Sequence, residues 1–481
     1  MFADVDTDYS PAAPASTCRS SCTTPRKGSS RSCGSSGTWP GPRRSPSCAA
    51  GKEPRRGRGT RARSWCARRP PGATRCPYWP RPTCRSIRTS GCAWRARTSR
   101  TSWNAPSTGV ATAAAPGRRC GEEIWPVLDY ADIEAGRVSE EDLARLRKRG
   151  CLVVRGHFPR EQALAWDQRI VDYVEGNRFF EHYRGPGDDF FGTVGSRPEI
   201  YPIYWSPPQM EARQSDRMAR VQAFLNARWR SESDGVQWFD PGRDSLYPDR
   251  IRRRPPGVDS GGLGAHLDPG TLDLWMTEAY QRAFRHLFDG TVESYDPWDA
   301  AHRTAGPQFE GSTMCSVFRT FQGWTALSDM KHDQGVLHTV PIPEAMGYLM
   351  LRPLLADVPE DDMCGVTVNQ VFPASEKWHS LLLRASSGIP DVRAGDSVWW
   401  HCALIHSVAP VKDQQGWGNV MYIPAAPWCP RNEAYAGSVR EAFESGSSPA
   451  DFPPEHYERS WPDRFAPARL NATGRRGLGI G

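Results

Sequence analysis

The sequence predicts a mainly β protein of the α+β class, a β-sandwich or barrel with flanking helices, preceded by an unstructured N-terminal segment. Three observations support this. Residues 1–120 lack the aliphatic side chains that a core needs, and residues 121–250 carry helical patterns. Residues of about 255–430 form short β-type runs separated by Gly, Pro, Asp and Asn. We therefore expect one domain over 121–481, with residues 431–481 as a C-terminal extension of the barrel.

The first 120 residues differ in composition from the rest of the chain. They hold 23 Lys+Arg but 4 Asp+Glu, contain no Leu, His or Gln, and include 9 of the 14 Cys. Such a segment cannot bury enough apolar surface to offset its chain entropy. A disulfide or zinc framework and a basic arm for nucleic acid or anionic membrane are two explanations. We favour a third, translation of a GC-rich gene in the wrong reading frame, which yields this mixture of residues.

Nothing in the chain predicts export or a membrane anchor. The N-terminus is acidic, with Asp4, Asp6 and Asp8, and no apolar stretch follows it as in a signal peptide. No run of about eighteen apolar residues occurs. We expect a cytoplasmic protein whose cysteines beyond residue 120 are reduced.

Helices dominate the first part of the predicted domain. Ser139 begins a helix that basic residues and Gly150 end, and a strand follows over Cys151–Arg155. Further helical patterns run over about 159–173 and 209–229.

The second part consists of short strands and one longer helix, predicted over about 271–288. The strands are predicted over 261–268, 317–327, 335–340, 367–372, 396–400 and 419–423. Residues 446–454 and 474–481 are predicted to be loop and tail.

The first motif with chemical content is Gly-Gly-Leu-Gly-Ala-His-Leu-Asp-Pro-Gly over residues 261–270. His266 and Asp268 lie two residues apart on a predicted strand, so both side chains point to the same face and can share one ion. Gly261, Gly262 and Gly264 leave room for a close backbone or ligand. Taken alone, this motif is more often a surface His beside a carboxylate.

A third ligand is available on a later strand. Residues 392–411 contain a Gly395-Asp396 turn, an apolar strand and two histidines, His401 and His406. An imidazole from this strand that faced His266 and Asp268 would complete a set of two His and one carboxylate, with three positions left open on the ion. This set is the facial triad of non-haem Fe(II) oxygenases.

Several motifs resemble one known group of enzymes in their order and spacing. They are His266-Leu-Asp268 and the segments 150–156, 324–329, 333–341, 395–410 and 416–424. Jointly they resemble the phytanoyl-CoA dioxygenase-like branch of the Fe(II)/2-oxoglutarate oxygenases and, more closely, the uncharacterised YbiU-like bacterial family.

The resemblance implies a double-stranded β-helix (jelly-roll, cupin-like) barrel and a defined set of site residues. In the family pattern the distal ligand lies about ten residues after the Gly-Asp turn, which assigns that role to His406 rather than His401. His266, Asp268 and His406 are then the catalytic metal ligands. The implied cofactors are Fe(II), O₂ and 2-oxoglutarate, and the implied reaction hydroxylates a small organic substrate and releases succinate and CO₂.

One residue of the family pattern is missing. Such oxygenases usually carry an Arg roughly ten to fourteen residues after the distal His, which pairs with the 5-carboxylate of 2-oxoglutarate. Residues 416–424 contain neither Arg nor Lys. Arg319, on the predicted strand 317–327, and Lys412 are the two candidates for binding this carboxylate. We interpret the basic run 252–254 as a solvated loop.

Two other functions remain open. A cupin-like barrel with the same ligands could be a metal-dependent hydrolase or isomerase, and a barrel without a co-substrate site could be a non-catalytic small-molecule-binding protein. We expect a small-molecule substrate, with no membrane and no nucleic acid as partner. The sequence indicates neither the substrate nor the oligomeric state, because substrate choice in such barrels depends on loops.

Overall fold

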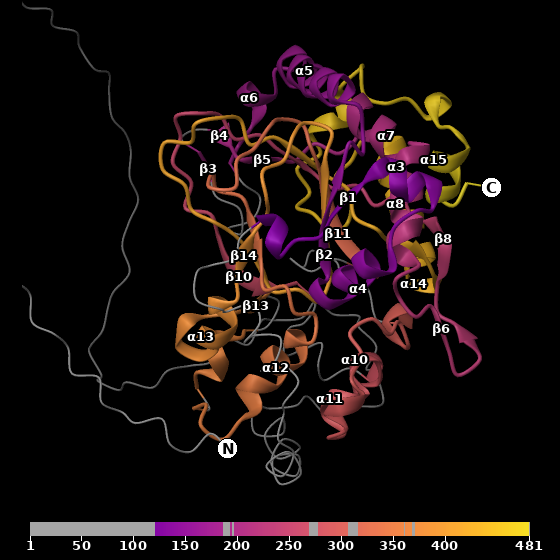
Figure 1. The fold of residues 1–481 in the computed structure, drawn as a ribbon. Helices are drawn as coiled ribbons and strands as arrows, with labels where there is room; N and C mark the ends of the chain where they lie inside the picture. The colour runs from indigo at the N-terminus through magenta and orange to yellow at the C-terminus, as the bar shows by residue number, and fades with distance from the viewer. Residues whose placement is uncertain are drawn as a thin grey trace, which may run out of the picture. The chain divides into compact units, whose positions relative to one another are not determined.

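The computed structural model describes residues 121–185, 193–194, 197–268, 278–305, 316–359, 361–367 and 371–480 (Figure 1). The predicted unstructured segment 1–120 lies outside these residues. So do parts of the predicted helix 271–288 and of the predicted strand 367–372.

A seven-stranded mixed sheet is the largest element of the fold. Its strand order is β1-β2-β15-β11-β17-β9-β5, and only the β1–β2 pair is parallel. The strands are β1 (Val127–Asp129), β2 (Cys151–Arg155), β5 (Ile200–Tyr201), β9 (Ile251–Arg252), β11 (Phe321–Ala326), β15 (Ser397–His401) and β17 (Val420–Tyr422).

A second, five-stranded sheet is antiparallel throughout, with the order β13-β10-β16-β12-β14. Its strands are β10 (Leu263–Leu267), β12 (Leu337–Thr339), β13 (Phe372–Pro373), β14 (Ser387–Gly388) and β16 (His406–Val408). Trp324, Val398 and Trp400 of the large sheet pack with Leu337 of the small sheet in one buried cluster. The two sheets therefore enclose an apolar core between them.

Helices cover the outer faces of both sheets. Trp166 and Val221, from two helices of the first half, pack against Trp399 and Phe321 of the large sheet. Met346, from a helix of the second half, packs against Leu267 of the small sheet. In Figure 1 the second set of helices lies below the strands and α5 lies above them. The helices are α3 (Tyr130–Ala135), α4 (Glu140–Arg149), α5 (Arg160–Gly176), α6 (Phe179–His182), α7 (Pro207–Arg213), α8 (Asp216–Asn226), α10 (Glu278–Ala283), α11 (Arg285–Phe288), α12 (Ala345–Leu351), α13 (Glu376–Arg384), α14 (Pro430–Ser445) and α15 (Ala472–Gly477).

Three short two-stranded ladders complete the sheets of the described residues. They pair β3 (Thr193–Val194) with β4 (Arg197–Pro198), β6 (Glu232–Ser233) with β7 (Val236–Gln237), and β8 (Asp240–Asp244) with β18 (Pro427–Trp428).

Local signals explain where several elements begin and end. The Ser139 hydroxyl accepts a hydrogen bond from the Asp142 N–H and caps α4, and Gly150 ends this helix in the left-handed conformation, as the sequence predicts. The predicted helix 209–229 is instead two helices, α7 and α8. They are separate because the Ser215 hydroxyl accepts from the Arg217 N–H and begins a new helix.

The second half contains more helix than the sequence predicts. The expectation of a single helix among the strands is wrong, because α12 and α13 also lie between β12 and β14 and cover the small sheet. The predicted tail 474–481 begins inside α15, which the side chain of Asn471 caps by accepting from the Gly474 N–H. Short, irregular apolar runs such as that of α12 do not distinguish helix from strand.

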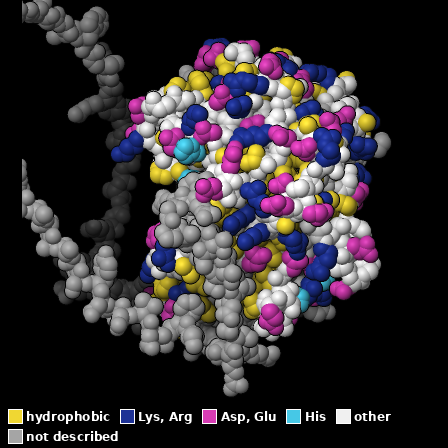
Figure 2. Space-filling model, in the orientation of Figure 1, with side chains coloured by type: hydrophobic (Ala, Val, Ile, Leu, Met, Phe, Trp, Pro, Cys, Tyr) yellow, Lys and Arg dark blue, Asp and Glu magenta, His cyan; other side chains and the backbone are white. Residues whose placement is uncertain are grey.

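None of the described helices is long and apolar enough to cross a membrane. On the face shown in Figure 2, Lys and Arg side chains are interspersed with Asp and Glu, so the described atoms of that face form no extended basic surface. Nucleic acids bind to basic stripes or patches, and this face offers none among its described atoms.

Candidate metal centre

Two neighbouring antiparallel strands bring the three predicted ligands together. His266 lies on β10, Asp268 directly follows this strand, and His406 begins β16. The two histidines are register partners, and their ring centroids are 4.3 Å apart. One possible ligand atom from each of the three residues lies within 4.8 Å of the others. This spacing fits three ligands around a single ion.

The close approach of β10 and β16 depends on one glycine. Gly262 has φ +70°, and a Cβ at this position would lie 2.2 Å from the carbonyl oxygen of Val408. Gly261 and Gly264 have open space around them. The predicted requirement for small residues therefore applies to Gly262 alone, because only there does the backbone of the neighbouring strand occupy the side-chain position.

Hydrogen bonds to the backbone orient both imidazoles. Nδ1 of His266 is 2.7 Å from the Gly264 carbonyl oxygen, and Nδ1 of His406 is 3.1 Å from the Leu404 carbonyl oxygen. A carbonyl oxygen can only accept, so each Nδ1 carries the hydrogen and each neutral ring presents the Nε2 lone pair. Both Nε2 atoms face Asp268 Oδ1, at 3.4 Å from His266 and 3.7 Å from His406. Such backbone contacts are typical of metal-binding histidines.

The charges of the cluster suit a divalent cation. Burial opposes ionisation of Asp268, but His406, His266 and Arg319 together hold the pKa of its carboxyl well below the usual value. Burial, reinforced by the nearby His266, lowers the pKa of His406 to about 4. Burial acts in the same direction on His266, yet the hydrogen bond and charge of Asp268 outweigh it and raise the pKa. At neutral pH the cluster thus offers a carboxylate and a neutral His406.

Arg319 lies at the cluster rather than on a strand. It precedes β11, and its Nη2 is 3.1 Å from Asp268 Oδ2, on the opposite side of the carboxylate from the histidines. Both side chains are largely buried, with 12% and 18% exposed. Arg319 therefore holds the orientation of Asp268.

His401 and Lys412 lie elsewhere. His401 ends β15 as a strand residue, stacks on Trp229 with 4.5 Å between ring centroids and 2° between planes, and accepts a hydrogen bond from the Ala403 N–H at Nδ1. Lys412 is exposed in a bend after Val411. The structure thus brings His406, and not His401, to His266 and Asp268.

Buried polar atoms without hydrogen-bond partners lie on β11, β12 and β15. Gln322 Nε2, Thr339 Oγ1 and Trp400 Nε1 are buried and make no hydrogen bond. Thr339 is the register partner of His406, and the Trp400 ring centroid is 5.5 Å from that of His406. Buried polar atoms of this kind are rare unless a water, an ion or a ligand satisfies them. Their position fits a polar co-substrate bound next to a metal.

Arg252 is a buried cation that the sequence interpretation missed. The prediction of a solvated loop at 252–254 is wrong, because Arg252, Arg253 and Arg254 are 4%, 7% and 0% exposed. Arg253 pairs with Asp167 and Arg254 pairs with Glu199.

Among the described residues, by contrast, no carboxylate pairs with Arg252. Its Nε donates to the Gly418 carbonyl oxygen, and its Nη2 lies 3.6 Å from the Met330 sulfur. Its register partner is Val420, a member of the core between the sheets, so Arg252 lies on the inner face of the large sheet. No sequence signal reveals this, because β9 is only two residues long.

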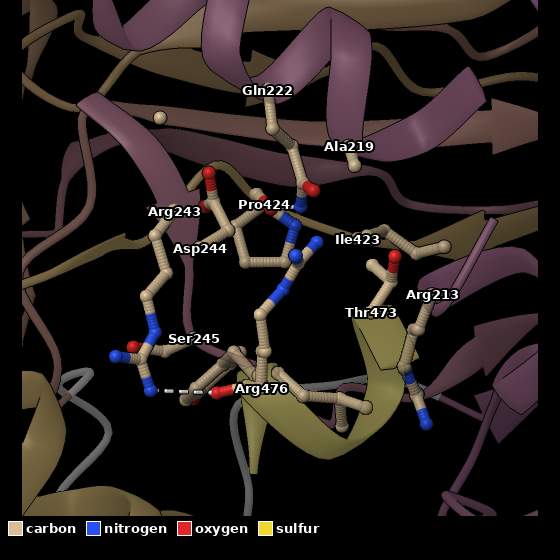
Figure 3. Close-up of a pocket in the computed structure, with 14 residues that line it drawn as sticks. Arg213, Ala219, Gln222, Arg243, Asp244, Ser245, Ile423, Pro424, Thr473 and Arg476 are labelled. Carbon is tan, nitrogen blue, oxygen red and sulfur yellow. Dashed lines mark hydrogen bonds between the residues drawn. The ribbon is translucent and has the colours of Figure 1, made fainter. Parts of the chain in front are cut away.

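Two cavities lie away from the cluster. A groove of about 700 Å³ is lined by charged residues that include Arg155, Asp329 and Asp391. A pocket of about 50 Å³ lies between α8, β8 and α15, where Arg476 extends towards Gln222 (Figure 3). Neither cavity is lined by a member of the cluster.

The fold and the cluster together define a mixed helix-and-sheet protein with a candidate site of two histidines and one carboxylate. The chain belongs to the Gig2-like family, whose sequence profile matches residues 93–480. It is 61% identical over 363 residues to the uncharacterised protein YbiU of Escherichia coli (strain K12). The aligned residues make up 75% of this chain and 86% of the relative. The predicted resemblance to the YbiU-like family is thereby confirmed.

Solved structures agree with this assignment. A crystal structure from Salmonella typhimurium LT2, provisionally named an oxidoreductase, is 54% identical, covers 84% of this chain and 98% of its own, and has a TM-score of 0.77. The GlcNAc Inducible Gene 2 protein (DUF1479) of Candida albicans is 24% identical over 82% of this chain and 86% of its own, with a TM-score of 0.64, and shares the fold. These relatives do not support the predicted phytanoyl-CoA dioxygenase-like branch.

Proposed function

We propose that the chain is a non-haem Fe(II) oxygenase that hydroxylates a small organic substrate with 2-oxoglutarate as co-substrate. The observation that carries the proposal is the His266–Asp268–His406 cluster, with possible ligand atoms within 4.8 Å and both imidazoles oriented by the backbone. The name of the Salmonella relative is consistent with it. In this proposal residues 121–481 are one oxygenase domain, and the two sheets are the walls of a double-stranded β-helix.

The three ligands and their surroundings have separate roles in this proposal. His266, His406 and Asp268 hold the iron, and Arg319 fixes the Asp268 carboxylate. Two nitrogens and one carboxylate leave open positions and suit Fe(II) better than Mg²⁺ or Ca²⁺. When bound, Fe(II) with O₂ and 2-oxoglutarate supplies an oxidation that yields succinate, CO₂ and the hydroxylated substrate. Both imidazoles are largely buried, at 4% exposed for His266 and 7% for His406, which limits the access of water to them.

We assign the distal carboxylate of 2-oxoglutarate to Arg252. Arg252 is buried, lies on the inner face and has no carboxylate partner among the described residues. Its register partner Val420 lies in the segment where the family pattern expects the cation. Of the two residues predicted from sequence, Arg319 is bound to Asp268 and Lys412 is exposed. Arg319 is the weaker candidate because its guanidinium already pairs with Asp268, and Lys412 is weaker because it is exposed and lacks the planar guanidinium that binds a carboxylate bidentately.

The test is succinate release from 2-oxoglutarate in the presence of Fe(II) and O₂, without an added substrate. We expect the wild type to form succinate slowly and the His266→Ala and Asp268→Ala variants to form none. The matched control is His332→Ala, which removes an exposed imidazole paired with Asp391. It should keep the wild-type rate.

The same assay separates the other two functions. Metal binding without any O₂-dependent turnover would contradict the oxygenase and favour a hydrolase or isomerase. Absence of metal binding would favour a non-catalytic barrel.

A further inference from the structure

The small pocket between α8, β8 and α15 is lined by three arginine residues from separate elements (Figure 3). Arg213 ends α7, Arg243 lies on β8, and Arg476 lies on α15. The pocket has a volume of about 50 Å³. A single water occupies roughly 10–15 Å³ of such a space. The pocket therefore has room for a few water molecules or for one small ion.

Buried hydrogen-bond donors of this pocket have no partner. Only 5% of Arg213 and 6% of Ser245 is exposed, and neither Arg213 Nε nor Ser245 Oγ makes a hydrogen bond in the described part of the chain. Arg243 Nε is a third buried atom of this kind. Buried polar atoms are rarely left in this state, so we expect a group in the pocket that accepts their hydrogen bonds.

Two backbone carbonyls hold the guanidinium of Arg213 in place. Its Nη1 donates to the Tyr204 carbonyl oxygen, and its Nη2 donates to the Asp249 carbonyl oxygen, 2.6 Å away. Among the described residues no carboxylate forms an ion pair with Arg213. A buried cation that contacts only neutral groups is costly, and an anion nearby would stabilise it.

Arg476 adds a positive charge that no described residue neutralises. The residue is exposed, and its guanidinium makes no hydrogen bond or ion pair within the described ranges. Figure 3 shows its side chain extending across the pocket towards Gln222. The Arg476 carbonyl oxygen accepts a hydrogen bond of 2.9 Å from Arg243 Nη2, so α15 and β8 are joined at the pocket.

One carboxylate, that of Asp244, also lines the pocket. Its Oδ1 accepts a hydrogen bond from the Ala426 N–H, and its Oδ2 accepts one from Asn226 Nδ2. Burial raises the pKa of this carboxyl to about 7, so it carries only part of its negative charge at neutral pH. Three guanidinium groups outnumber this one carboxylate, and the pocket is therefore electropositive.

The donors of the pocket favour a tetrahedral oxyanion as the ligand. Guanidinium N–H groups can only donate, and a serine hydroxyl can donate. These donors come from α7, from β8 and the residue after it, and from α15, which lie on different walls of the pocket. A carboxylate has two acceptor oxygens in one plane, whereas phosphate has acceptor oxygens in several directions and pairs strongly with arginine.

We propose that this pocket binds phosphate, either as the free ion or as the phosphoryl group of a small molecule. Arg213, Arg243 and Arg476 supply the positive charge, and Ser245 supplies a hydroxyl donor. A bound phosphate connects α15 with α7 and β8. The pocket is lined by no member of the His266–Asp268–His406 cluster, and the inference does not depend on the proposed oxygenase function.

The experiment measures binding of inorganic phosphate to the protein by isothermal titration calorimetry at constant ionic strength, with phenyl phosphate and acetate titrated in parallel. We expect the wild type to bind phosphate at least roughly tenfold more tightly than acetate. Arg476→Gln should weaken phosphate binding by roughly tenfold or more, because a charged hydrogen bond is lost. Tighter binding of phenyl phosphate would identify the phosphoryl group of a larger molecule as the ligand, and tighter binding of inorganic phosphate would identify the free ion.

The matched control is Arg475→Gln. It removes an exposed guanidinium one residue earlier in α15 that does not line the pocket, and it should leave the phosphate affinity unchanged. Ser245→Ala tests a buried donor independently. It removes a hydroxyl without a partner, so thermal unfolding in the absence of phosphate should not change, whereas phosphate affinity should fall by roughly threefold or more.

Four results would overturn the inference: no phosphate binding by the wild type, equal affinity for phosphate and acetate, unchanged affinity in Arg476→Gln, or an equal loss in Arg475→Gln. If Arg476→Gln does not fold by circular dichroism, Ser245→Ala decides in its place. Wild-type phosphate affinity in Ser245→Ala would then count against the pocket.

Discussion

Asp268 is shared between two imidazoles on one oxygen and a guanidinium on the other. Each of these contacts lies on a different strand or loop, so the carboxylate connects β10, β16 and the segment before β11. The pKa shifts of the three side chains indicate their protonation states. Asp268 is ionised, His406 is neutral at neutral pH, and His266 is the group that retains a proton most readily.

The raised pKa of His266 predicts how metal binding depends on pH. Asp268 raises this pKa above the ordinary 6.5 despite the opposing effect of burial. In the metal-free protein the resulting stabilisation is present below pH 6.5 and is lost as the pH rises through the raised value. A metal must displace this proton, so we expect Fe(II) affinity to increase with pH over that range, with proton release visible when anaerobic calorimetry is repeated in buffers of different ionisation enthalpy. A pH-independent affinity would contradict this assignment.

Replacement of Arg252 tests the co-substrate site. Arg252→Gln should raise KM for 2-oxoglutarate by roughly tenfold or more, because a charged hydrogen bond to the distal carboxylate is lost. The value of kcat should change less, since the metal ligands stay in place. Steady-state succinate formation measures both constants. Lys412→Gln is the control, and an increase in KM for this variant instead of Arg252→Gln would return the role to Lys412.

At the residue level, the clustering of His266 and Asp268 could be predicted from sequence, whereas the burial of Arg252 could not. His266 and Asp268 are two apart on a strand, and this local spacing already places them on one face. The surroundings of Arg252 depend on strands that are distant in sequence. The neighbouring sequence does not show that Arg253 forms an ion pair with Asp167. Nor does it show that the Arg252 guanidinium contacts only the Gly418 carbonyl oxygen and the Met330 sulfur among the described residues.

Gly262 controls the spacing of β10 and β16, the strands that bring the proposed metal ligands together. Gly262→Ala places a methyl group 2.2 Å from the Val408 carbonyl oxygen and forces an alanine into φ +70°. We expect a loss of about 2 kcal/mol or more in the free energy of unfolding, and weaker metal binding, because β10 must move away from β16. Chemical denaturation and metal titration measure the two effects.

The matched control is Gly264→Ala, two residues further along the chain in β10, where a Cβ meets nothing within 4 Å. It should change stability by less than about 0.5 kcal/mol. Equal effects of the two substitutions would show that β10 and β16 are not held as closely as described.

Elements with strong local signals were predictable from sequence, and those without were not. Ser139 and Gly150 define α4 at both ends, and Cys151–Arg155 is β2 as predicted. The division of 209–229 into α7 and α8 depends on one serine that also fits a helix interior. Helix α12 is buried on most sides against the small sheet, so its sequence lacks the polar face that marks a surface helix.

At the scale of the whole molecule, hydrogen bonds of Glu458 link the C-terminal segment to the first half of the described chain. Its buried carboxylate accepts hydrogen bonds from the backbone N–H groups of Tyr204 and Trp205 and from the Tyr173 hydroxyl. Glu458→Ala leaves these donors buried without an acceptor, and we expect a loss of about 2–4 kcal/mol in unfolding free energy. Thermal unfolding measures the loss. Ser460→Ala, in the same short turn, is the control.

Glu458 also predicts a pH dependence of stability. Burial, against the opposing hydrogen bonds, raises the pKa of its carboxyl from 4.5 to about 7. The folded protein therefore holds this proton more tightly than the unfolded chain, and stability should fall as the pH rises from about 4.5 to about 7. Glu458→Gln should flatten this slope, which unfolding curves at several pH values will show. An unchanged slope would assign the dependence to another group.

The general architecture followed from composition and turn signals, since short strands after a helical first half do form two sheets with helices outside. The order of the strands within the two sheets could not be predicted from these signals. β15 pairs with β2 although 241 residues separate Arg155, the end of β2, from Ser397, the start of β15, and only tertiary packing selects that partner.

The imidazoles of His266 and His406, the proposed metal ligands, each form a hydrogen bond with the carbonyl oxygen two residues earlier in the chain, at Gly264 and at Leu404. Each ring is therefore held in its orientation by its own backbone segment, whether or not an ion is bound. Binding or release of an ion should require little rearrangement of the two imidazoles. The metal-free protein should therefore bind the ion again without unfolding.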